Sequence, residues 1–248
     1  MHDESPVWDR ESLEAPHDTA DKDRRVRRMF DAIAPRYQFI NTLFSAGRDA
    51  AWRRKAVDLA RVVPDDDVLD IACGTGDFAR EFALAGPRTV IGTDFSHQML
   101  THAVAGRGPA ICWCESDALG LPFADGSFSI TSCAFGIRNW QNLDVGFREM
   151  FRVLRPGGRT VILEFSRPPG RLARGMYELY ANRVMPVLAS LISRDRMGAY
   201  RYLPRSVVSF PGSELIRTKL RDAGFRGIEA YRLTMGVVTV YIGRRNQA

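Results

Sequence analysis

From Val68 onward, short apolar runs alternate with amphipathic segments, and this alternation restricts the fold more than any other pattern in the sequence. The apolar runs occupy Val68–Ala72, Thr89–Gly92, Ala110–Cys114, Phe128–Ala134 and Arg159–Phe165. Strands that alternate with helices form βαβ units with parallel strands. A helical segment at Ser213–Ala223 precedes two further runs, Phe225–Leu233 and Val237–Ile242, which have no helix between them and indicate an antiparallel edge strand. We predict an α/β, Rossmann-like doubly wound sheet of seven strands, mostly parallel.

Three segments lie outside this alternation. Residues 24–63 have helical spacing interrupted by Pro35, which predicts N-terminal helices. Residues 166–209 have helical spacing without a strand pattern, and we expect a helical lid, because insertions at the carboxyl end of a parallel sheet usually build the substrate side of a site. Residues 1–23 are acidic and poor in aliphatic side chains, which predicts a disordered tail before one domain over residues 24–248.

Charge is distributed unevenly along the chain. The net charge is +6 over 248 residues, but residues 1–23 hold eight acids against Arg10 and Lys22. Eight arginines lie between Glu164 and Arg205 against three acids, which places much of the basic excess in the predicted lid. A basic surface suits an anionic partner such as phospholipid, nucleic acid or an acidic substrate; codon bias is the alternative explanation, since 32 of the 35 basic residues are Arg.

Several classes of protein are excluded by what the sequence lacks. No apolar run approaches the roughly 18 residues of a spanning helix, and the first 23 residues lack the apolar stretch of a secretory signal. The four cysteines include no Cys-x-x-Cys pair, and Cys112 and Cys114 have no further ligands at zinc spacing. We therefore predict core thiols, no metal site and a cytoplasmic location.

The turn after the first predicted strand carries the strongest binding motif. Val68–Ala72 leads into Gly74, Thr75 and Gly76 and then into a helix. Glycines at such a turn allow a tight bend and a close approach of a ligand to the backbone. An acid follows or ends each of the first three strands, and these acids are Asp70, Asp94 and Asp117.

The three acids distinguish between possible cofactors. Asp94 can accept hydrogen bonds from both ribose hydroxyls of an adenosine, and Asp117 can accept one from an adenine amino group. Asp70 would repel a dinucleotide pyrophosphate but attract the ammonium and sulfonium of S-adenosylmethionine. We predict S-adenosylmethionine, bound by Asp70, Gly74, Thr75, Gly76, Asp94, Phe95, Asp117 and Ala118. As structural alternatives, Asp94 could cap the next helix and Asp117 could stabilise its own turn.

More specific motifs extend over nearly the whole chain. They include Phe30-Asp-Ala-Ile-Ala-Pro-Arg-Tyr37, Val68–Ala79, Phe135-Gly136-Ile137-Arg138-Asn139, Leu163-Glu164-Phe165-Ser166 and Tyr202-Leu203-Pro204-Arg-Ser206. With these motifs, the segment from Val26 to Arg245 resembles the ubiquinone/menaquinone biosynthesis C-methyltransferases, class I S-adenosylmethionine-dependent enzymes that methylate a ring carbon of a polyprenylated quinol. The sequence departs from that family at Gln38, at Arg48 and at Tyr241, where the family commonly has Asp, His and His.

The resemblance implies a reaction and its acceptor. We expect methylation of demethylmenaquinol to menaquinol; the benzoquinol of ubiquinone synthesis and another lipophilic or phenolic acceptor stay open. A nucleotide-binding oxidoreductase, against which Asp70 argues, and a cofactor-binding scaffold without catalysis are the alternatives from other classes. The resemblance also implies a homodimer.

The chemistry of a quinol suggests catalytic residues within these motifs. A phenol with a pKa near 10 is ionised about one part in a thousand at pH 7, so favouring the phenolate could contribute about 4 kcal/mol. We expect Arg138 to stabilise the phenolate, with Asn139 and Tyr37 orienting the ring or a bridging water. Water takes the proton, because a guanidinium does not titrate near neutral pH. The structural alternative for Arg138 is an ion pair with Asp144 or Glu149.

The partners follow from the charge and from missing motifs. Arginines beside Met, Leu and Tyr suit a lid over residues 166–209 that takes a prenyl tail from an anionic membrane surface, which would make the protein peripheral at the inner face of the cell membrane. An ordinary packed lid with solvated arginines is the alternative. Nucleic acid is not expected as a partner, because the Asn/Asp-Pro-Pro-Tyr and Pro-Cys motifs of base methylation are absent.

Overall fold

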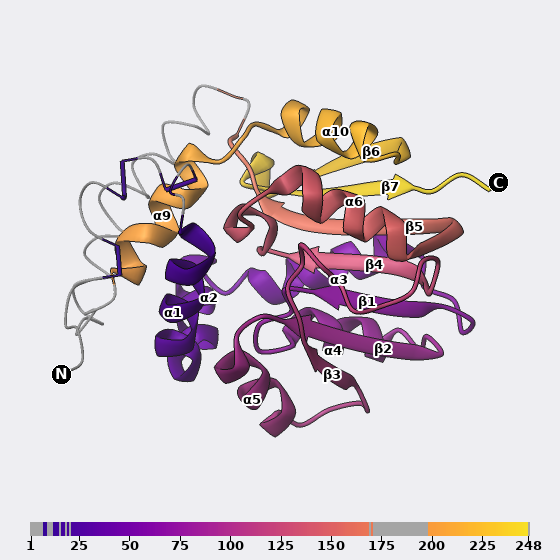
Figure 1. Ribbon diagram of the computed structural model, residues 1–248, viewed down its shortest axis with the longest axis horizontal. Coiled ribbons are helices and arrows are strands. Elements are labelled where there is room, and N and C mark those ends of the chain that lie inside the picture. Colours follow the sequence, from indigo (N-terminus) through magenta and orange to yellow (C-terminus); the bar gives the residue numbers. More distant parts are fainter. Residues whose placement is uncertain are drawn as a thin grey trace.

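A seven-stranded sheet runs through the centre of the computed structural model, which describes residues 7–8, 12–14, 16–17, 19, 21–168, 170 and 198–247 (Figure 1). The strand order is β3-β2-β1-β4-β5-β7-β6. The strands are β1 (Asp67–Ile71), β2 (Thr89–Asp94), β3 (Cys112–Glu115), β4 (Phe128–Ala134), β5 (Leu154–Phe165), β6 (Arg226–Leu233) and β7 (Val238–Arg244). Strand β7 runs antiparallel to both of its neighbours, β5 and β6, while β1 to β5 pair in parallel. The predicted sheet is confirmed, with β7 one place in from the edge because β6 pairs with its outer side.

Helices cover both faces of the sheet. On one face, α3 (Asp49–Ala60) and α4 (Asp77–Leu84) pack against strand residues such as Val68. On the other, α6 (Leu143–Val153) and α10 (Ser213–Asp222) pack against Leu69 and Ile71. Successive side chains of a strand point to opposite faces, so β1 is buried along its whole length, as expected for a parallel strand between two helical layers. A further helix, α5 (His97–Ala105), contacts β2 and β3.

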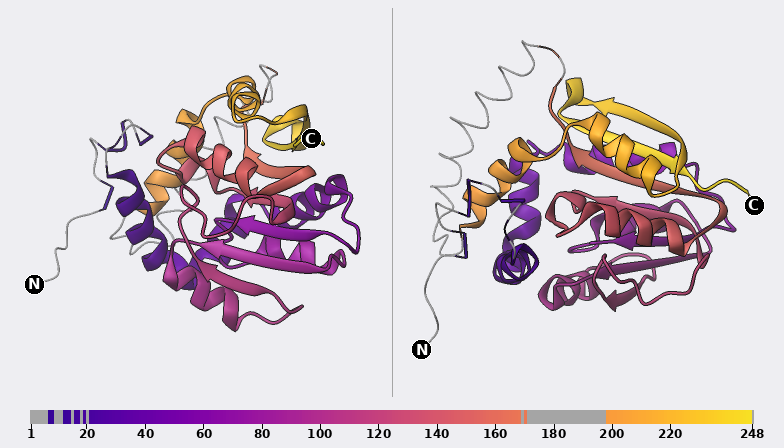
Figure 2. Two further views of the ribbon diagram at one scale, coloured as in Figure 1. Left: turned by 45° about the vertical axis from the view of Figure 1, so that its right-hand side comes forward. Right: turned by 45° about the horizontal axis from the view of Figure 1, so that its top comes forward.

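A third group of helices stands across the carboxyl ends of the parallel strands. Figures 1 and 2 show α1 (Lys22–Ile33), α2 (Tyr37–Phe44) and α9 (Ala199–Ser209) gathered at this end of the sheet. The 3-10 turn η1 (Ala34–Arg36) separates α1 from α2, because Pro35 cannot continue the first helix. The apolar stripe of α1, with Val26, Met29 and Phe30, packs on Tyr202 of α9.

The described residues of the N-terminal segment differ from the expectation of a disordered tail over residues 1–23. Val7, Trp8 and Leu13 are buried in the cluster that joins α1 and α9, and the Trp8 ring stacks on Tyr202 with centroids 4.2 Å apart. These few apolar side chains outweigh the acidic composition. The predicted lid over residues 166–209 is helical at its end, in α9, while residues 171–197 lie outside the described residues. No helix among the described residues is long and apolar enough to cross a membrane.

Candidate active site

The strand order creates an opening at the carboxyl ends of β1 and β4. The connection after β1 leads to β2 on one side, and the connection after β4 leads to β5 on the other, so a crevice forms between the two turns. Both turns bend the backbone into the left-handed region directly after the strand, at Ala72 (φ +53°) and Phe135 (φ +56°). Strain of this kind in non-glycine residues is concentrated at functional sites.

The glycine turn after β1 is shaped by close neighbours. Gly76 has a φ of +83° and precedes the first residue of α4. A Cβ atom at Gly76 would lie 2.3 Å from the Trp113 ring, so no larger residue fits without a rearrangement. The Gly74 amide donates a hydrogen bond of 2.8 Å to Asp94 Oδ2. The turn is therefore fixed by contacts from β2 and β3 and does not depend on the glycines alone.

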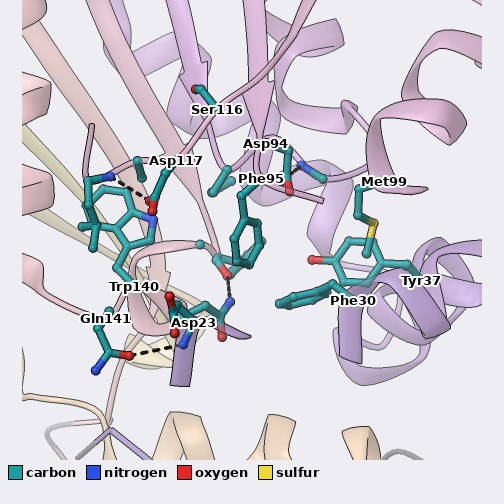
Figure 3. A pocket seen from close by; sticks show the side chains of 18 residues that line it. Asp23, Phe30, Tyr37, Asp94, Phe95, Met99, Ser116, Asp117, Trp140 and Gln141 are labelled. Atoms are coloured by element: carbon teal, nitrogen blue, oxygen red, sulfur yellow. Dashed lines mark hydrogen bonds between the residues drawn. The ribbon is translucent and has the colours of Figure 1, made fainter. Parts of the chain in front are cut away.

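A cavity that opens to solvent lies in the crevice, with about 650 Å³ of empty space when the solvent at its mouth is included (Figure 3). Seven of the predicted site residues line it, namely Tyr37, Gly74, Asp94, Phe95, Asp117, Ala118 and Asn139. Figure 3 shows Phe95 between the side formed by Asp117 and Trp140 and the side formed by Phe30 and Tyr37. Aromatic walls with carboxylates at three positions, Asp23, Asp94 and Asp117, suit a ligand with a flat ring that bears amino groups and with free hydroxyl groups.

Helix α1 covers the cavity and is tied down on two sides. Ser96 Oγ, at the start of α5, donates to Asp31 Oδ1 at 2.6 Å. Lys22 Nζ donates to the Trp140 carbonyl oxygen at 2.6 Å. The contributions of α1 to the cavity, Asp23 and Phe30, were not predicted from the sequence, because its pattern indicates a helix without indicating where the helix lies.

Asp94 joins the glycine turn to the start of α5. Its Oδ2 accepts from the Gly74 amide, and its Oδ1 accepts from the Ser96 amide at 2.9 Å. Burial raises the Asp94 pKa to about 6, although the two amides oppose the shift. The capping role considered for Asp94 belongs to Ser96, whose hydroxyl accepts from the Met99 amide. Each carboxylate oxygen of Asp94 keeps a second lone pair for a ligand.

Asp117 and Asp70 occupy different surroundings. Asp117 Oδ1 accepts from the Leu119 amide at 2.9 Å, so the turn-stabilising role is present, and Asp117 also lines the main cavity. Asp70 is fully buried and lines a smaller neighbouring cavity together with Arg53. Its Oδ1 accepts from Ser132 Oγ at 2.7 Å, while Oδ2 has no hydrogen-bond partner among the described residues. Burial raises the Asp70 pKa to about 7.

Two of the predicted cofactor-binding residues point elsewhere. The Thr75 hydroxyl donates to Asp77 Oδ2 at 3.1 Å, and Thr75 lines a polar cavity on the outer side of the glycine turn, together with Arg80. Gly76 faces Trp113. Thr75 and Gly76 therefore shape the turn that presents Gly74 to the main cavity.

Arg138 is held behind the cavity wall. It belongs to the 3-10 turn η2 (Ile137–Asn139) after β4, and only 4% of its surface is exposed. Its Nη1 donates to Glu164 Oε1 at 2.8 Å and to the Phe135 carbonyl oxygen at 2.5 Å. Burial alone would lower the Arg138 pKa, but Glu164 holds that pKa above its ordinary value. Arg138 Nε has no partner among the described residues.

The ion pair considered for Arg138 exists, but with another acid. Asp144 pairs with Lys219 and Glu149 pairs with Arg152, both at 2.7 Å. Glu164, at the carboxyl end of β5, is the acid that meets Arg138. Glu164 was not predicted as a site residue, although it lies near the carboxyl end of an apolar strand as Asp70 and Asp94 do.

Asn139 and Tyr37 both line the cavity, and they belong to two different elements. Asn139, in η2, accepts a hydrogen bond from the Tyr202 hydroxyl at 3.0 Å. Tyr37, at the start of α2, packs edge-on against Phe30 with centroids 5.7 Å apart. Burial raises the Tyr37 pKa, and the nearby Arg138 charge opposes the shift. Of the predicted catalytic residues, the structure brings Tyr37 and Asn139 to the cavity and leaves Arg138 directly behind them.

Known proteins are similar to this chain in sequence and in fold. The ubiE/COQ5 methyltransferase family matches residues 18–245. A relative from Geotalea daltonii, named ubiquinone/menaquinone biosynthesis C-methyltransferase UbiE, is 41% identical over 236 residues, which cover 91% of this chain and 98% of the relative. The demethylmenaquinone methyltransferase of Thermus thermophilus is 44% identical over 221 residues, with 88% and 100% covered. That of Deinococcus radiodurans is 43% identical over 231 residues, with 91% and 95% covered.

Solved structures of other proteins resemble this chain in fold. A SAM-dependent methyltransferase from Thermotoga maritima superposes with a TM-score of 0.64, covering 89% of this chain and 100% of its own, at 20% sequence identity. A methyltransferase from Methanococcus maripaludis superposes with a TM-score of 0.60, covering 88% and 94%, at 17% identity. At these identities, the likeness concerns the fold alone.

Proposed function

The chain belongs to the ubiE/COQ5 methyltransferase family, as its motifs indicated, and from this premise we propose that it transfers a methyl group from S-adenosylmethionine to a ring carbon of a polyprenylated quinol. The observation that carries the proposal is the near full-length match to relatives named for this reaction at 41–44% identity. The aromatic and acidic cavity at the switch point of the sheet supports it.

We propose demethylmenaquinol as the acceptor. The relatives from Thermus thermophilus and Deinococcus radiodurans carry the name demethylmenaquinone methyltransferase. The benzoquinol of ubiquinone synthesis is the second candidate, since the Geotalea daltonii relative is named for both pathways.

The residues around the cavity fit S-adenosylmethionine. The free lone pairs of Asp94 suit two ribose hydroxyls, and Asp117 with Phe95 suits an adenine. The unpartnered Oδ2 of Asp70 suits an ammonium group, and Arg53 beside it suits a carboxylate. When bound, this molecule supplies an electrophilic methyl group on a sulfonium. Asp70, just before the glycine turn, disfavours a dinucleotide pyrophosphate, which argues against an oxidoreductase.

The proposed chemistry of this chain is stabilisation of the quinol as its phenolate. Arg138 stays charged because its pKa is raised, so it cannot take the quinol proton, and its role is electrostatic. Asn139 donates toward the phenolate oxygen from the cavity wall, and Tyr37 positions the ring. The proton leaves to water. With the ring carbon in line with the methyl group, the new C–CH₃ bond would form as the methyl–sulfur bond breaks. The hydrogen on that ring carbon then leaves as a proton and the phenolate oxygen is protonated again, which restores the aromatic quinol.

We further propose contact with an anionic membrane surface through residues 166–209, with the protein peripheral at the inner face of the cell membrane. Helix α9 ends this segment beside the cavity-covering α1. Exposed apolar side chains support the proposal, with Phe39 of α2 at 61% exposure and Val208 of α9 at 46%, both on helices at the carboxyl end of the sheet. The homodimer stays a prediction.

The test is a methyl-transfer assay with purified protein, isotopically labelled S-adenosylmethionine and reduced quinols, read by mass spectrometry. The proposal expects labelled methyl on the naphthoquinol and little on the benzoquinol. The matched control is the oxidised naphthoquinone, which has no hydroxyl to ionise and should not react. Methylation of neither quinol, with tight binding of S-adenosylhomocysteine, would favour the scaffold alternative; preference for NAD in calorimetry would favour an oxidoreductase.

A further inference from the structure

A hydrogen bond links α9 to the turn that carries Arg138 and Asn139. Tyr202 of α9 is fully buried, and its hydroxyl donates to Asn139 Oδ1 at 3.0 Å. Its ring is held by stacking on Trp8 and by packing against the apolar side of α1. A buried tyrosine hydroxyl costs free energy unless it is bonded, so this contact fixes where the hydroxyl lies.

The two partners of Asn139 determine how its amide is oriented. The Phe135 carbonyl oxygen lies 3.4 Å from Asn139 Nδ2, and a carbonyl can only accept, so the nitrogen must face it. The amide oxygen then faces Tyr202. Nδ2 carries a second hydrogen that no described residue accepts, and Asn139 lines the cavity. The amide is therefore held as a hydrogen-bond donor toward whatever occupies the cavity.

Tyr202 keeps the role of donor in this arrangement. Burial raises its pKa, and Arg138 only partly opposes the shift, so the hydroxyl stays protonated near neutral pH. Without the hydroxyl, only the long contact of 3.4 Å to the Phe135 carbonyl oxygen would hold the amide, and a rotation by 180° would turn the amide oxygen toward that carbonyl and the cavity. An amide oxygen facing a phenolate would repel it.

We propose that Tyr202 is a positioning residue, which orients the Asn139 amide so that its N–H stabilises the phenolate of the acceptor. The inference rests on the proposed function and deepens it. Through this one hydrogen bond, α9, the last helix before residue 210, becomes part of the catalytic arrangement. Loss of a net contribution of about 1 kcal/mol corresponds to a roughly 5- to 10-fold lower kcat.

A double-mutant cycle separates this role from a structural one. Tyr202→Phe keeps the ring and its stacking and should lower kcat 5- to 10-fold, with the affinity for S-adenosylhomocysteine unchanged. In an Asn139→Ala background, the same change should have no further effect on kcat. Tyr231→Phe is the matched control on the edge strand β6, where the ring is partly exposed, and should leave kcat as in the wild type. An unchanged kcat in Tyr202→Phe, or an equal loss in both backgrounds, would overturn the proposal.

A second measurement does not depend on turnover. The absorbance of 1-naphthol, bound in the presence of S-adenosylhomocysteine, reports its ionisation as pH is raised. The proposal expects bound naphthol to ionise at a lower pH in the wild type than in Tyr202→Phe, and equal values in the two proteins would contradict it. If the wild type methylates no quinol, the proposed function fails, and the naphthol titration still decides the orienting role of Tyr202.

Discussion

Replacing Asp94 by Asn tests the assignment of the cofactor site most directly. Both carboxylate oxygens accept hydrogen bonds from backbone amides, one from Gly74 at 2.8 Å and one from Ser96 at 2.9 Å. An asparagine of the same shape has only one oxygen, so its NH₂ group must face one of two N–H donors. The substitution therefore breaks one of these bonds and removes an acceptor for the ribose hydroxyls.

The size of the effect follows from the bonds that are lost. A hydrogen bond to a charged acceptor contributes about 1.5–3 kcal/mol, and the loss of one ribose bond together with a displaced Gly74 turn amounts to about 3 kcal/mol. That corresponds to a roughly 100-fold higher Kd. Asp94→Ala removes every acceptor and should weaken binding further.

Calorimetric titration with S-adenosylhomocysteine at pH 8 measures this effect, because both Asp94 and Asp70 are ionised there. Asp125→Asn is the control, since this carboxylate is 78% exposed and pairs with Arg152 away from the cavity. The control should bind as the wild type does. A Kd for Asp94→Asn within threefold of the wild type would refute the assignment of Asp94 to the ribose.

Three further predictions follow from the buried charges. Affinity for S-adenosylhomocysteine should fall at least 10-fold from pH 8 to pH 5, because the Asp94 pKa is about 6 and the Asp70 pKa about 7, and protonation removes the acceptors; a flat calorimetric profile would contradict this. Because the Asp70 pKa is raised in the folded protein, its carboxyl group lowers the stability of the ligand-free protein as pH rises from about 4 to about 7. Asp70→Asn should therefore melt a few degrees higher than the wild type at pH 8, as scanning fluorimetry can measure. The same variant should bind the ligand more weakly. Arg138→Met combined with Glu164→Gln avoids leaving a buried charge unpaired and should keep ligand affinity while lowering kcat roughly 100-fold or more; near-normal turnover would remove Arg138 from the mechanism.

Local patterns were enough to predict the strands and to place Asp94 and Asp117 at strand ends that meet at the cavity. The strand at Phe128–Ala134 has the predicted bounds, because its apolar run is flanked by clear turn residues. Asp94 and Asp117 reach the cavity because parallel strands end at one edge of a sheet, so residues at successive strand ends converge. Each of these inferences needs only a sequence period or a turn signal.

Contacts between distant elements were not accessible in this way. The covering position of α1, with Phe30 over the cavity, depends on how a helix docks on others, and its stripe indicates only that one face is buried. The burial of Trp8 and Leu13 was hidden by the acidic residues around them. In both cases tertiary packing overrides the local composition.

Glu164 was within reach of the same rule that identified Asp94. Ala134 pairs with Leu163 in parallel register, so the residue after Leu163 stands beside the turn after β4 that carries Arg138. The pairing changes what Arg138 can do. A guanidinium bound to a carboxylate is no longer a free cation, so we expect Arg138 to act on the phenolate as the positive end of an oriented ion pair. Orientation of this kind depends on each hydrogen bond that holds the turn, and the proposed role of Tyr202 follows from its bond to Asn139 in that turn.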